Sequence, residues 1–335
     1  MKTKSVGSFL RIGARVASLA GIVCASVSFA APPTDNAEAL AREQWSETIA
    51  NTSVPSAGCF MAEYPSTAWM PVGCERAPDV PFVPRTGAGS DTVGDEDDYA
   101  AGVTGTLTKT VGSFPVVTGV TSEKGTGGAN SYSLQLNSNF IGDGYSPGTS
   151  AACDGYSQCI AWAQFIYSSD ERAVFMQFWL INFNSYAECP AGWNTYSGSC
   201  YTNSNAVHAP KLSISDLSGM KVAATAVNGG NDTVIFTGGG LAYSVSALDS
   251  SYVDLAASGN WDQSEFNIIG DGGGSKARFN TGSAITVRVT TTDGSTTAPT
   301  CIANGGTTGE TNNLILHACK ASGGASPHIQ FLERN

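Results

Sequence analysis

Two side-chain amides are notable because they interrupt otherwise apolar strand patterns. Residues 159–183 hold the densest run of aromatic and aliphatic side chains in the chain, with a polar break at residues 168–172. Apolar residues alternate at period two on both sides of the break, which predicts an antiparallel hairpin. Gln164 and Gln177 each fall on an apolar face of this hairpin. Burying an amide without hydrogen-bond partners costs roughly 1–3 kcal/mol, so each glutamine either bonds within the protein or is presented to a ligand.

Common catalytic and metal-binding motifs are absent from the sequence. There is no GxSxG nucleophile turn, no phosphate-binding loop and no HExxH zinc motif. The three histidines, His208, His317 and His328, are far apart in sequence, and each is better interpreted as a surface or strand residue than as part of a Ser-His-Asp triad. The CxxC and HxxxH spacings of a zinc site are also missing. The sequence therefore predicts no metal and no cofactor.

The first 30 residues have the organisation of a secretory signal. Four Lys and Arg precede an apolar run at residues 16–27, and Ser28-Phe29-Ala30 supplies a small-x-small cleavage site. We therefore expect residues 1–30 to be removed from a secreted protein, either extracellular or periplasmic. No later stretch of the sequence is long and apolar enough to span a membrane.

The mature chain is expected to be strongly acidic. Loss of residues 1–30 removes four of the 17 Lys and Arg and none of the 28 Asp and Glu, which leaves 13 bases against 28 acids and a formal charge of −15. Nucleic acid and anionic membrane surfaces are poor partners for such a charge. We therefore predict neither as a partner, and the sequence carries no signal for an oligomeric state.

Eight cysteines remain once Cys24 leaves with the signal, an even number that suits disulfides in an oxidising compartment. They fall into four pairs of close neighbours in sequence. The simplest connectivity joins Cys59 to Cys74, Cys153 to Cys159, Cys189 to Cys200 and Cys301 to Cys319.

The part before residue 101 has little strand character. Residues 34–50 have close to helical spacing, which predicts one short helix. Periodicity then disappears over residues 51–98, a stretch that nevertheless contains several aromatic residues. We interpret residues 31–100 as an N-terminal arm or propeptide-like segment, with a disulfide loop, that packs on the core.

Short alternating segments dominate the rest of the chain. At least nine of them, residues 208–215 included, occur in residues 101–300 between Gly, Asn and Ser turns. This pattern predicts an all-β core, either a two-sheet antiparallel sandwich or a closed barrel. Residues 301–335 indicate a disulfide-pinned hairpin followed by a last strand.

A second stretch bears on function. It reads Ser264-Glu265-Phe266, continues through a Gly/Ser-rich loop at residues 272–275, and reaches Ala277-Arg278-Phe279 before a final strand. It resembles the glutamic peptidases, the eqolisins, in which Ala-Glu-Trp precedes such a loop and a later Ala-x-Phe. Upstream, AWAQFIYSS and VFMQFWLINF follow the order of that family's glutamine-bearing and aromatic strands. The likeness covers roughly residues 130–291 and is one of strand order and texture.

The resemblance implies both a fold and an activity. The fold is a concanavalin- or lectin-like sandwich of two antiparallel sheets, and the activity is peptide hydrolysis at acid pH. Glu265 would be the general base and acid, and Gln164 would donate a hydrogen bond to the carbonyl oxygen as it becomes an oxyanion. Gln177, Trp162 and Trp179 would contact the protein or peptide substrate. This chemistry needs no metal, serine or histidine.

The chain departs from the family's pattern at several positions. Asn267 is an extra residue, and Ile269 or Gly270 stands where the family has a second glutamate. Gln177 replaces a glutamate of the aromatic strand. Gln158, just before Cys159, is an alternative oxyanion donor, but we prefer Gln164 because a regular strand holds a side chain rigidly. These departures also fit an inactive relative.

Two further functions fit the same residues. A non-catalytic sandwich could bind polysaccharide if Trp162, Trp179 and Trp193 stacked against sugar rings, although the same tryptophans would serve equally well in a core. A structural extracellular role would need no ligand site and is compatible with the Gly, Ser and Thr content.

Overall fold

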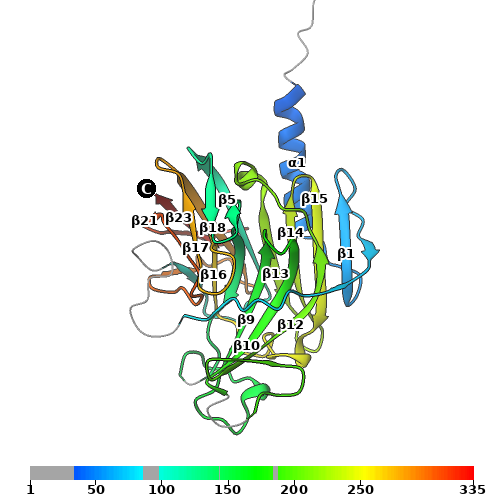
Figure 1. The fold of residues 1–335 in the computed structure, drawn as a ribbon, viewed down its shortest axis with the longest axis vertical. Coiled ribbons are helices and arrows are strands. Elements are labelled where there is room, and N and C mark those ends of the chain that lie inside the picture. The colour runs from blue at the N-terminus through cyan, green and yellow to red at the C-terminus, as the bar shows by residue number, and fades with distance from the viewer. Residues whose placement is uncertain (1–33, 86–97, 143, 184–187) are drawn as a thin grey trace, which may run out of the picture.

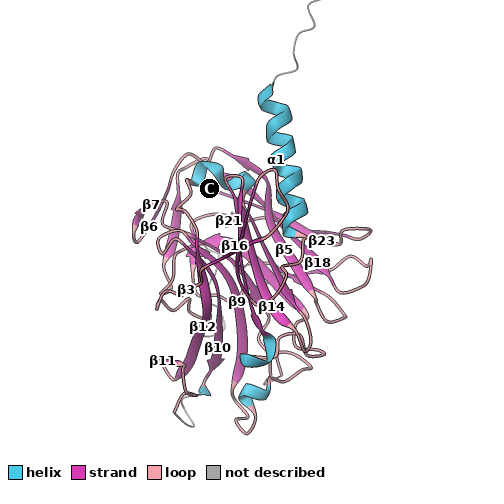
Figure 2. Cartoon of the chain, turned by 90° about the vertical axis from the view of Figure 1, so that its right-hand side faces the viewer, coloured by secondary structure: helices cyan, strands magenta, loops and turns pink. Residues whose placement is uncertain are grey.

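The protein folds into two antiparallel sheets that pack face to face. A computed structural model describes residues 34–85, 98–142, 144–183 and 188–335. The described strands form two large sheets and a small third one (Figures 1 and 2). This architecture confirms the predicted all-β sandwich. The predicted secretory signal, residues 1–30, lies outside the described residues.

The first sheet forms one layer and includes the last strand of the chain. Its strand order is β2 (Met70–Val72), β1 (Gly58–Glu63), β15 (Leu241–Leu248), β14 (Asn231–Gly238), β13 (Lys221–Ala226), β5 (Lys109–Thr118), β18 (Ala284–Thr292), β23 (His328–Arg334) and β21 (Ile315–Leu316). A short strand, β22 (Lys320–Ser322), also pairs with β23.

The second sheet contains the hairpin predicted from residues 159–183. Its strand order is β11 (Asn194–Tyr196), β12 (Ser199–His208), β10 (Ala173–Ile181), β9 (Ile160–Ser168), β8 (Ser133–Ser138), β16 (Gln263–Ile269), β4 (Ala100–Gly102) and β19 (Thr300–Ile302), with β3 (Glu75–Arg76) paired to β12. The small sheet consists of β20 (Thr311–Asn312), β17 (Lys276–Phe279), β6 (Glu123–Gly125) and β7 (Gly128–Ala129).

The main hydrophobic core lies between the two large sheets. Side chains alternate across each strand, so every second residue of the second sheet points inward. In β9 the inward residues are Ala161, Ala163, Phe165 and Tyr167, and all of them are fully buried. The intervening residues point to the opposite face, which we call the outer face of the second sheet.

One close contact between the sheets lies directly behind Glu265. Phe266, the next residue along β16, points inward and packs on Phe114 of β5, with 5.0 Å between the ring centroids. Its ring also covers Gly112, where an added Cβ would lie 2.0 Å from the Phe266 Cγ. Only a residue without a side chain fits there. Phe266 thus anchors β16 from behind and leaves Glu265 on the outer face.

The region before residue 101 combines one helix with sheet strands. Helix α1 (Thr34–Ala50) extends beyond the sandwich at its N-terminal end (Figure 1). Its C-terminal part is anchored by Trp45 and Ile49, which pack on Ala62 of β1 and Ala242 of β15. Within the described residues, no helix is long and apolar enough to cross a membrane.

Two sequence interpretations need correction. The stretch 51–98 has no visible periodicity, yet β1 forms six residue pairs with β15 in the first sheet. Residues 208–215 were expected to form a strand, but β12 ends at His208 and the short 3-10 helix Ile214–Gly219 begins soon after. The Ser213 side chain accepts a hydrogen bond from the Ser215 N–H, and such local capping competes with strand pairing. Two more single-turn 3-10 helices cover Ala151–Cys153 and Asp249–Ser251.

All four predicted disulfides are confirmed. They join Cys59 to Cys74, Cys153 to Cys159, Cys189 to Cys200 and Cys301 to Cys319. Four closed disulfides indicate an oxidising compartment, because cytosolic thiols are kept reduced.

Candidate active site

Glu265 and Gln164 lie in one row across the outer face of the second sheet. Glu265 of β16 is directly opposite Asn137 of β8, and Asn137 is directly opposite Gln164 of β9. Gln164 is in turn opposite Gln177 of β10, which lies across from Asn203 of β12. Neighbouring strands are about 4.8 Å apart, so Glu265 and Gln164 are separated by roughly 10 Å at the backbone. Their side chains flank Asn137.

The Glu265 carboxylate is held by one oxygen. Its Oε2 accepts hydrogen bonds from the Thr307 N–H (2.7 Å), the Thr307 hydroxyl (2.8 Å) and Asn137 Nδ2 (3.2 Å). Its Oε1 is buried and has no hydrogen-bond partner among the described residues. The side chain is therefore fixed in place while one oxygen is left to bind a reacting group.

The Gln164 amide is similarly half bonded. Its Nε2 donates one hydrogen bond to Gln135 Oε1 at 3.0 Å. An amide nitrogen has two N–H groups, so the second one remains available. Gln164 Oε1 and Asn137 Oδ1 are both buried without a partner in the part of the chain that the structure describes. The row thus concentrates unused hydrogen-bonding capacity next to Glu265.

Burial dominates the acid–base behaviour of this row. Desolvation raises the pKa of Glu265 above its ordinary value, while the hydrogen bonds from Thr307 and Asn137 and the charge of Arg85 lower it. Asp98 lies close enough to interact, and its own pKa is raised well above normal by burial and by the charges of Glu265 and Glu333. Trp261 and Phe266 are close to Glu265 in sequence, but their side chains belong to the inner core and not to this face.

Gln177 and the two tryptophans also lie on the outer face, but all are covered. Trp162 and Trp179 are opposite each other on β9 and β10, and both are fully buried. The Trp162 indole donates to Thr307 Oγ1 at 3.1 Å, and the Trp179 indole donates to Gln177 Oε1 at 3.0 Å. Neither ring offers an open face to a sugar. Trp179 instead bonds Gln177 of the row, and Trp162 bonds Thr307, which holds Glu265.

A segment of the chain itself covers Gln177. Residues 78–85, which we call the crossing segment, follow β3 and traverse the second sheet from β12 toward the loop that contains Thr307 (Figure 1). Gln177 Oε1 accepts from the Phe82 N–H at 2.7 Å, and its Nε2 donates to the Val80 carbonyl at 2.9 Å. The crossing segment therefore occupies the position that the sequence analysis assigned to a substrate.

A hollow remains open where the crossing segment ends. It has a volume of about 350 Å³ and is lined by Arg85, Phe140, Tyr145 and Thr307, among others. Since Thr307 binds the Glu265 carboxylate, the hollow adjoins the candidate site. It is large enough for one or two amino-acid side chains.

Sequence reasoning missed several residues of this face. Asn137, Gln135 and Thr307 hold the two proposed catalytic side chains, and Glu310 lies beside them with its pKa raised by burial. The alternation of Gln135 and Asn137 with two leucines in β8 was a signal for an outer-face pair. No comparable signal marks Thr307 or Glu310, because both lie in a loop. Gln158, the alternative donor, is exposed in a turn before β9.

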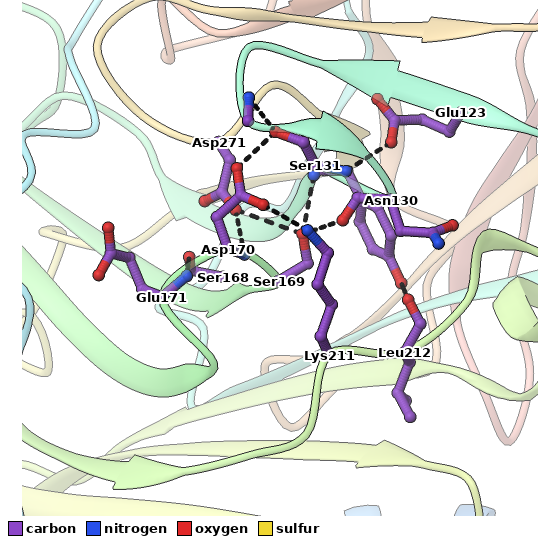
Figure 3. A network of polar contacts seen from close by, with 12 residues as sticks. Glu123, Asn130, Ser131, Ser168, Ser169, Asp170, Glu171, Lys211, Leu212 and Asp271 are labelled. Carbon is purple, nitrogen blue, oxygen red and sulfur yellow. Dashed lines mark hydrogen bonds and ion pairs between the residues drawn. The ribbon is translucent and has the colours of Figure 1, made fainter.

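A separate polar network closes the β9–β10 turn (Figure 3). Asp170 accepts from Lys211 Nζ at 2.6 Å and from the Ser131 hydroxyl at 2.5 Å, and its N–H donates to Asp271 Oδ2 at 2.8 Å. Glu123 accepts from the Ser131 N–H at 2.8 Å. Burial raises the pKa of Asp271 to about 7 and that of Glu123 to about 8. This network ties the turn to neighbouring loops and lies apart from the Glu265 row.

Comparisons with known proteins give one distant structural likeness. No protein-family model matches the chain, and no curated protein matches it significantly. A crystal structure of scytalido-glutamic peptidase with a transition state analog inhibitor is similar with a TM-score of 0.28 and 13% sequence identity, over 70% of this chain and 97% of that one. The chain is thus distantly similar to a solved glutamic peptidase.

Proposed function

We propose that the protein is a secreted peptidase that hydrolyses peptide bonds under acidic conditions, with Glu265 as general base and acid and Gln164 as oxyanion donor. The observation that supports this proposal best is the register of the second sheet. It aligns a carboxylate with one unused oxygen and an amide with one unused N–H on the same face, with one residue between them.

The chemistry follows from these two groups. Glu265 Oε1 accepts a proton from a water molecule, and the oxygen of that water attacks the carbonyl carbon of the peptide bond. The Gln164 N–H donates to the carbonyl oxygen as negative charge develops on it. Glu265 then gives its proton to the leaving nitrogen as the C–N bond breaks, which restores the carboxylate. Water supplies both the hydroxyl of the new acid and the proton of the new amine.

The neighbouring residues serve to position these two groups. Thr307 and Asn137 bind only Oε2 of Glu265, so Oε1 keeps its direction. Gln135 accepts one N–H of Gln164 and fixes the plane of the amide. Such rigid support matters because a donor must point at the oxyanion before the reaction begins.

The pKa values set an acidic working range. Glu265 must be ionised to accept a proton, and its raised pKa places the acidic limb of activity above the pKa of an ordinary glutamate. At higher pH the buried carboxyl of Glu333, whose pKa burial raises to about 7, becomes charged inside the protein. We therefore expect activity to fall again as the pH approaches 7, because this charge destabilises the fold beside the site.

The direct test is hydrolysis of an acid-denatured protein between about pH 3 and pH 7, a range that brackets the carboxyl pKa values above. The wild type should cut it. Glu265→Gln keeps the shape of the side chain but cannot accept the proton, so hydrolysis should fall by about 100- to 10,000-fold. Gln164→Ala should lower kcat by about 100- to 1000-fold with a smaller change in KM, as expected for a transition-state interaction.

Two outcomes would overturn the proposal. One is a folded Phe82→Ala variant, with Glu265 and Gln164 intact and the crossing segment weakened, that leaves the substrate intact across the whole range. The other is a Glu265→Gln variant that cuts as fast as the wild type.

A further inference from the structure

The crossing segment has the character of a bound peptide. Three prolines recur at every third position, Pro78, Pro81 and Pro84, and favour an extended backbone. No regular secondary structure forms in residues 77–83, and Pro84 makes one isolated antiparallel bridge with Thr308. The segment is therefore held through contacts to the sheet and loops and not by its own internal hydrogen bonds.

Most of these contacts are made to the backbone of the segment. Asn203 Nδ2 donates to the Pro78 carbonyl at 2.8 Å, and the Gln177 amide binds the Val80 carbonyl and the Phe82 N–H. Further backbone contacts include Gly273 N–H to the Pro81 carbonyl (2.7 Å), Val83 N–H to Glu310 Oε1 (3.0 Å), Gly309 N–H to the Val83 carbonyl (2.7 Å) and Arg85 N–H to the Thr307 carbonyl (2.7 Å). Among side chains, Asp79 Oδ1 accepts from Asn194 Nδ2 (2.9 Å) and from the Tyr201 hydroxyl (3.1 Å). Backbone recognition of this kind would hold many extended peptides.

One apolar side chain of the segment is recognised through packing. Phe82 is fully buried in a small apolar cluster with Ile166 of β9 and Phe175 of β10. Its ring meets the Phe175 ring edge-on, with 5.9 Å between centroids. Small residues, Ala77, Ala173 and Ala206, complete the cluster. The cluster forms a recess for one bulky apolar side chain.

The path of the segment leads past the candidate catalytic groups. Phe82 is bound by Gln177, the cross-strand neighbour of Gln164. Three residues later, Arg85 is bound by Thr307, which also holds the Glu265 carboxylate. Val83 is bound by Glu310, which accepts from Gln135, the partner of Gln164. Phe82, at one end of this short stretch, thus contacts Gln177 of the row, and Arg85, at the other end, contacts Thr307, which holds Glu265.

We propose that the crossing segment occupies the substrate cleft as a tethered peptide, so that the cleft binds extended peptides with a bulky apolar residue where Phe82 lies. The inference rests on the proposed function and specifies its substrate class. It also makes the segment a competitor of the substrate. A tethered ligand acts at an effective concentration on the order of millimolar, which is enough to mask a cleft of moderate affinity.

The test uses a fluorescent peptide with the segment's own sequence, Pro-Asp-Val-Pro-Phe-Val-Pro-Arg, acetylated and amidated at its ends. Binding is measured by anisotropy to the full mature chain carrying Glu265→Gln, so that hydrolysis cannot consume the probe. The matched control peptide has Ala in place of Phe. The competing variant adds Phe82→Ala, which empties the recess and weakens the tethered segment.

The expected result is a clear order of affinities. Phe82→Ala should bind the Phe peptide at least about tenfold more tightly than the chain with an intact segment, because the tethered competitor is weakened. It should prefer the Phe peptide to the Ala peptide by about tenfold or more, since filling the recess buries a whole aromatic side chain. Phe82→Leu, a milder change, should show an intermediate gain and serves as the test if Phe82→Ala fails to fold.

A folded Phe82 variant that does not distinguish the two peptides would overturn the inference. This failure can be told apart from failure of the proposed function. If the Phe peptide binds but the wild type, which has Glu265, hydrolyses nothing, the peptide cleft is supported and the proposed peptidase activity is refuted. Suppose instead that the wild type hydrolyses substrate, that Phe82→Ala leaves KM unchanged, and that the peptide does not bind. The tethered-peptide inference is then refuted, while the proposed peptidase activity stands.

Discussion

Glu265 and Glu310 are two buried carboxylates on the same side of the second sheet, and they differ in how completely they are bonded. Glu310 Oε1 accepts from the N–H groups of Val83 (3.0 Å) and Gly274 (2.9 Å). Its Oε2 accepts from the Thr308 hydroxyl and from Gln135 Nε2. In Glu265, three donors bind Oε2, while no donor within the described ranges binds Oε1.

The difference shows why burial alone does not identify a catalytic residue. Desolvation raises the pKa of both carboxyls. A carboxylate with all its oxygens bonded, as in Glu310, fixes the loops and the crossing segment around it. A buried oxygen without a donor costs free energy, and such a cost persists where function requires it. The unbonded oxygen of Glu265 is therefore the feature that favours Glu265 over Glu310 as the proposed general base.

The largest expected effect comes from exchanging each carboxylate for an amide. Glu265→Gln should remove hydrolysis by about 100- to 10,000-fold, whereas Glu310→Gln should stay within about tenfold of the wild type. Glu310→Gln should also loosen the crossing segment, because its NH₂ replaces either Oε1, which accepts from the Val83 N–H, or Oε2, which holds the adjoining Thr308. Single-turnover rates and peptide anisotropy on both variants measure the two effects. Equal loss of hydrolysis in two folded variants would erase the distinction between the carboxylates.

A smaller effect is expected from Asn137, which donates to Glu265 Oε2. Removing this donor by Asn137→Leu should raise the Glu265 pKa further, since the hydrogen bond favours the ionised form. The general base then ionises at higher pH, so the acidic limb of kcat/KM should move upward by about one pH unit or less. The pH–rate profile is the measurement.

Asn203→Leu is the matched control for Asn137→Leu. Asn203 is an amide in the same row, but it bonds the Pro78 carbonyl and Gln177, and three strands lie between it and Glu265. Its substitution should leave the acidic limb where it is. A shift in both variants, or in neither, would show that Asn137 does not tune Glu265.

The smallest predicted effect concerns stability. Asp271 has its pKa raised to about 7 by burial, so the folded state keeps a proton that the unfolded chain loses above about pH 4. Glu333 and Glu123 have raised pKa values of the same sign. Because the folded state binds more protons, stability should be greatest at acidic pH and should fall as the pH rises toward 8.

Asp271→Asn removes one of these titrating groups while its oxygen can still accept from Asp170 N–H. Thermal unfolding between pH 4 and pH 8, a window of about four units, should show a shallower decline in Tm for the variant, by about 2–4 °C for each kcal/mol recovered. A Tm of the wild type that rises from pH 5 to pH 8 would contradict the raised pKa values. If Tm of the variant depends on pH as steeply as that of the wild type, Asp271 is not one of the groups that cause the decline.

The sequence predicts those features that depend on neighbouring residues. The β9–β10 hairpin follows from alternation over residues 160–181, and the four disulfides join close neighbours in sequence. Gln164 is recognisable as an amide on an apolar face, and Glu265 came from a family resemblance. Their alignment is not indicated by any local pattern, because it depends on the pairing of β8 with both β16 and β9.

Long-range pairings explain what the sequence did not show. Strand β1 pairs with β15, which lies about 180 residues further along the chain. Its place in the sheet therefore depends on a distant partner and is not visible in the local sequence. Thr307 reaches Glu265 from a loop 42 residues further along the chain. The crossing segment has an extended, proline-rich sequence that suits a linker equally well, and its position over Gln177 depends on hydrogen bonds across 95 residues or more. Contacts of this kind are set by the sheet topology.

The two buried tryptophans of the outer face have a practical consequence. Trp162 bonds Thr307, and Trp179 bonds Gln177, so each indole is attached to a residue that also holds the crossing segment. Indole emission shifts to longer wavelength when water reaches the ring. Departure of the segment would hydrate these rings and change the intrinsic fluorescence, which gives the unlabelled protein a built-in optical signal for whether its cleft is open.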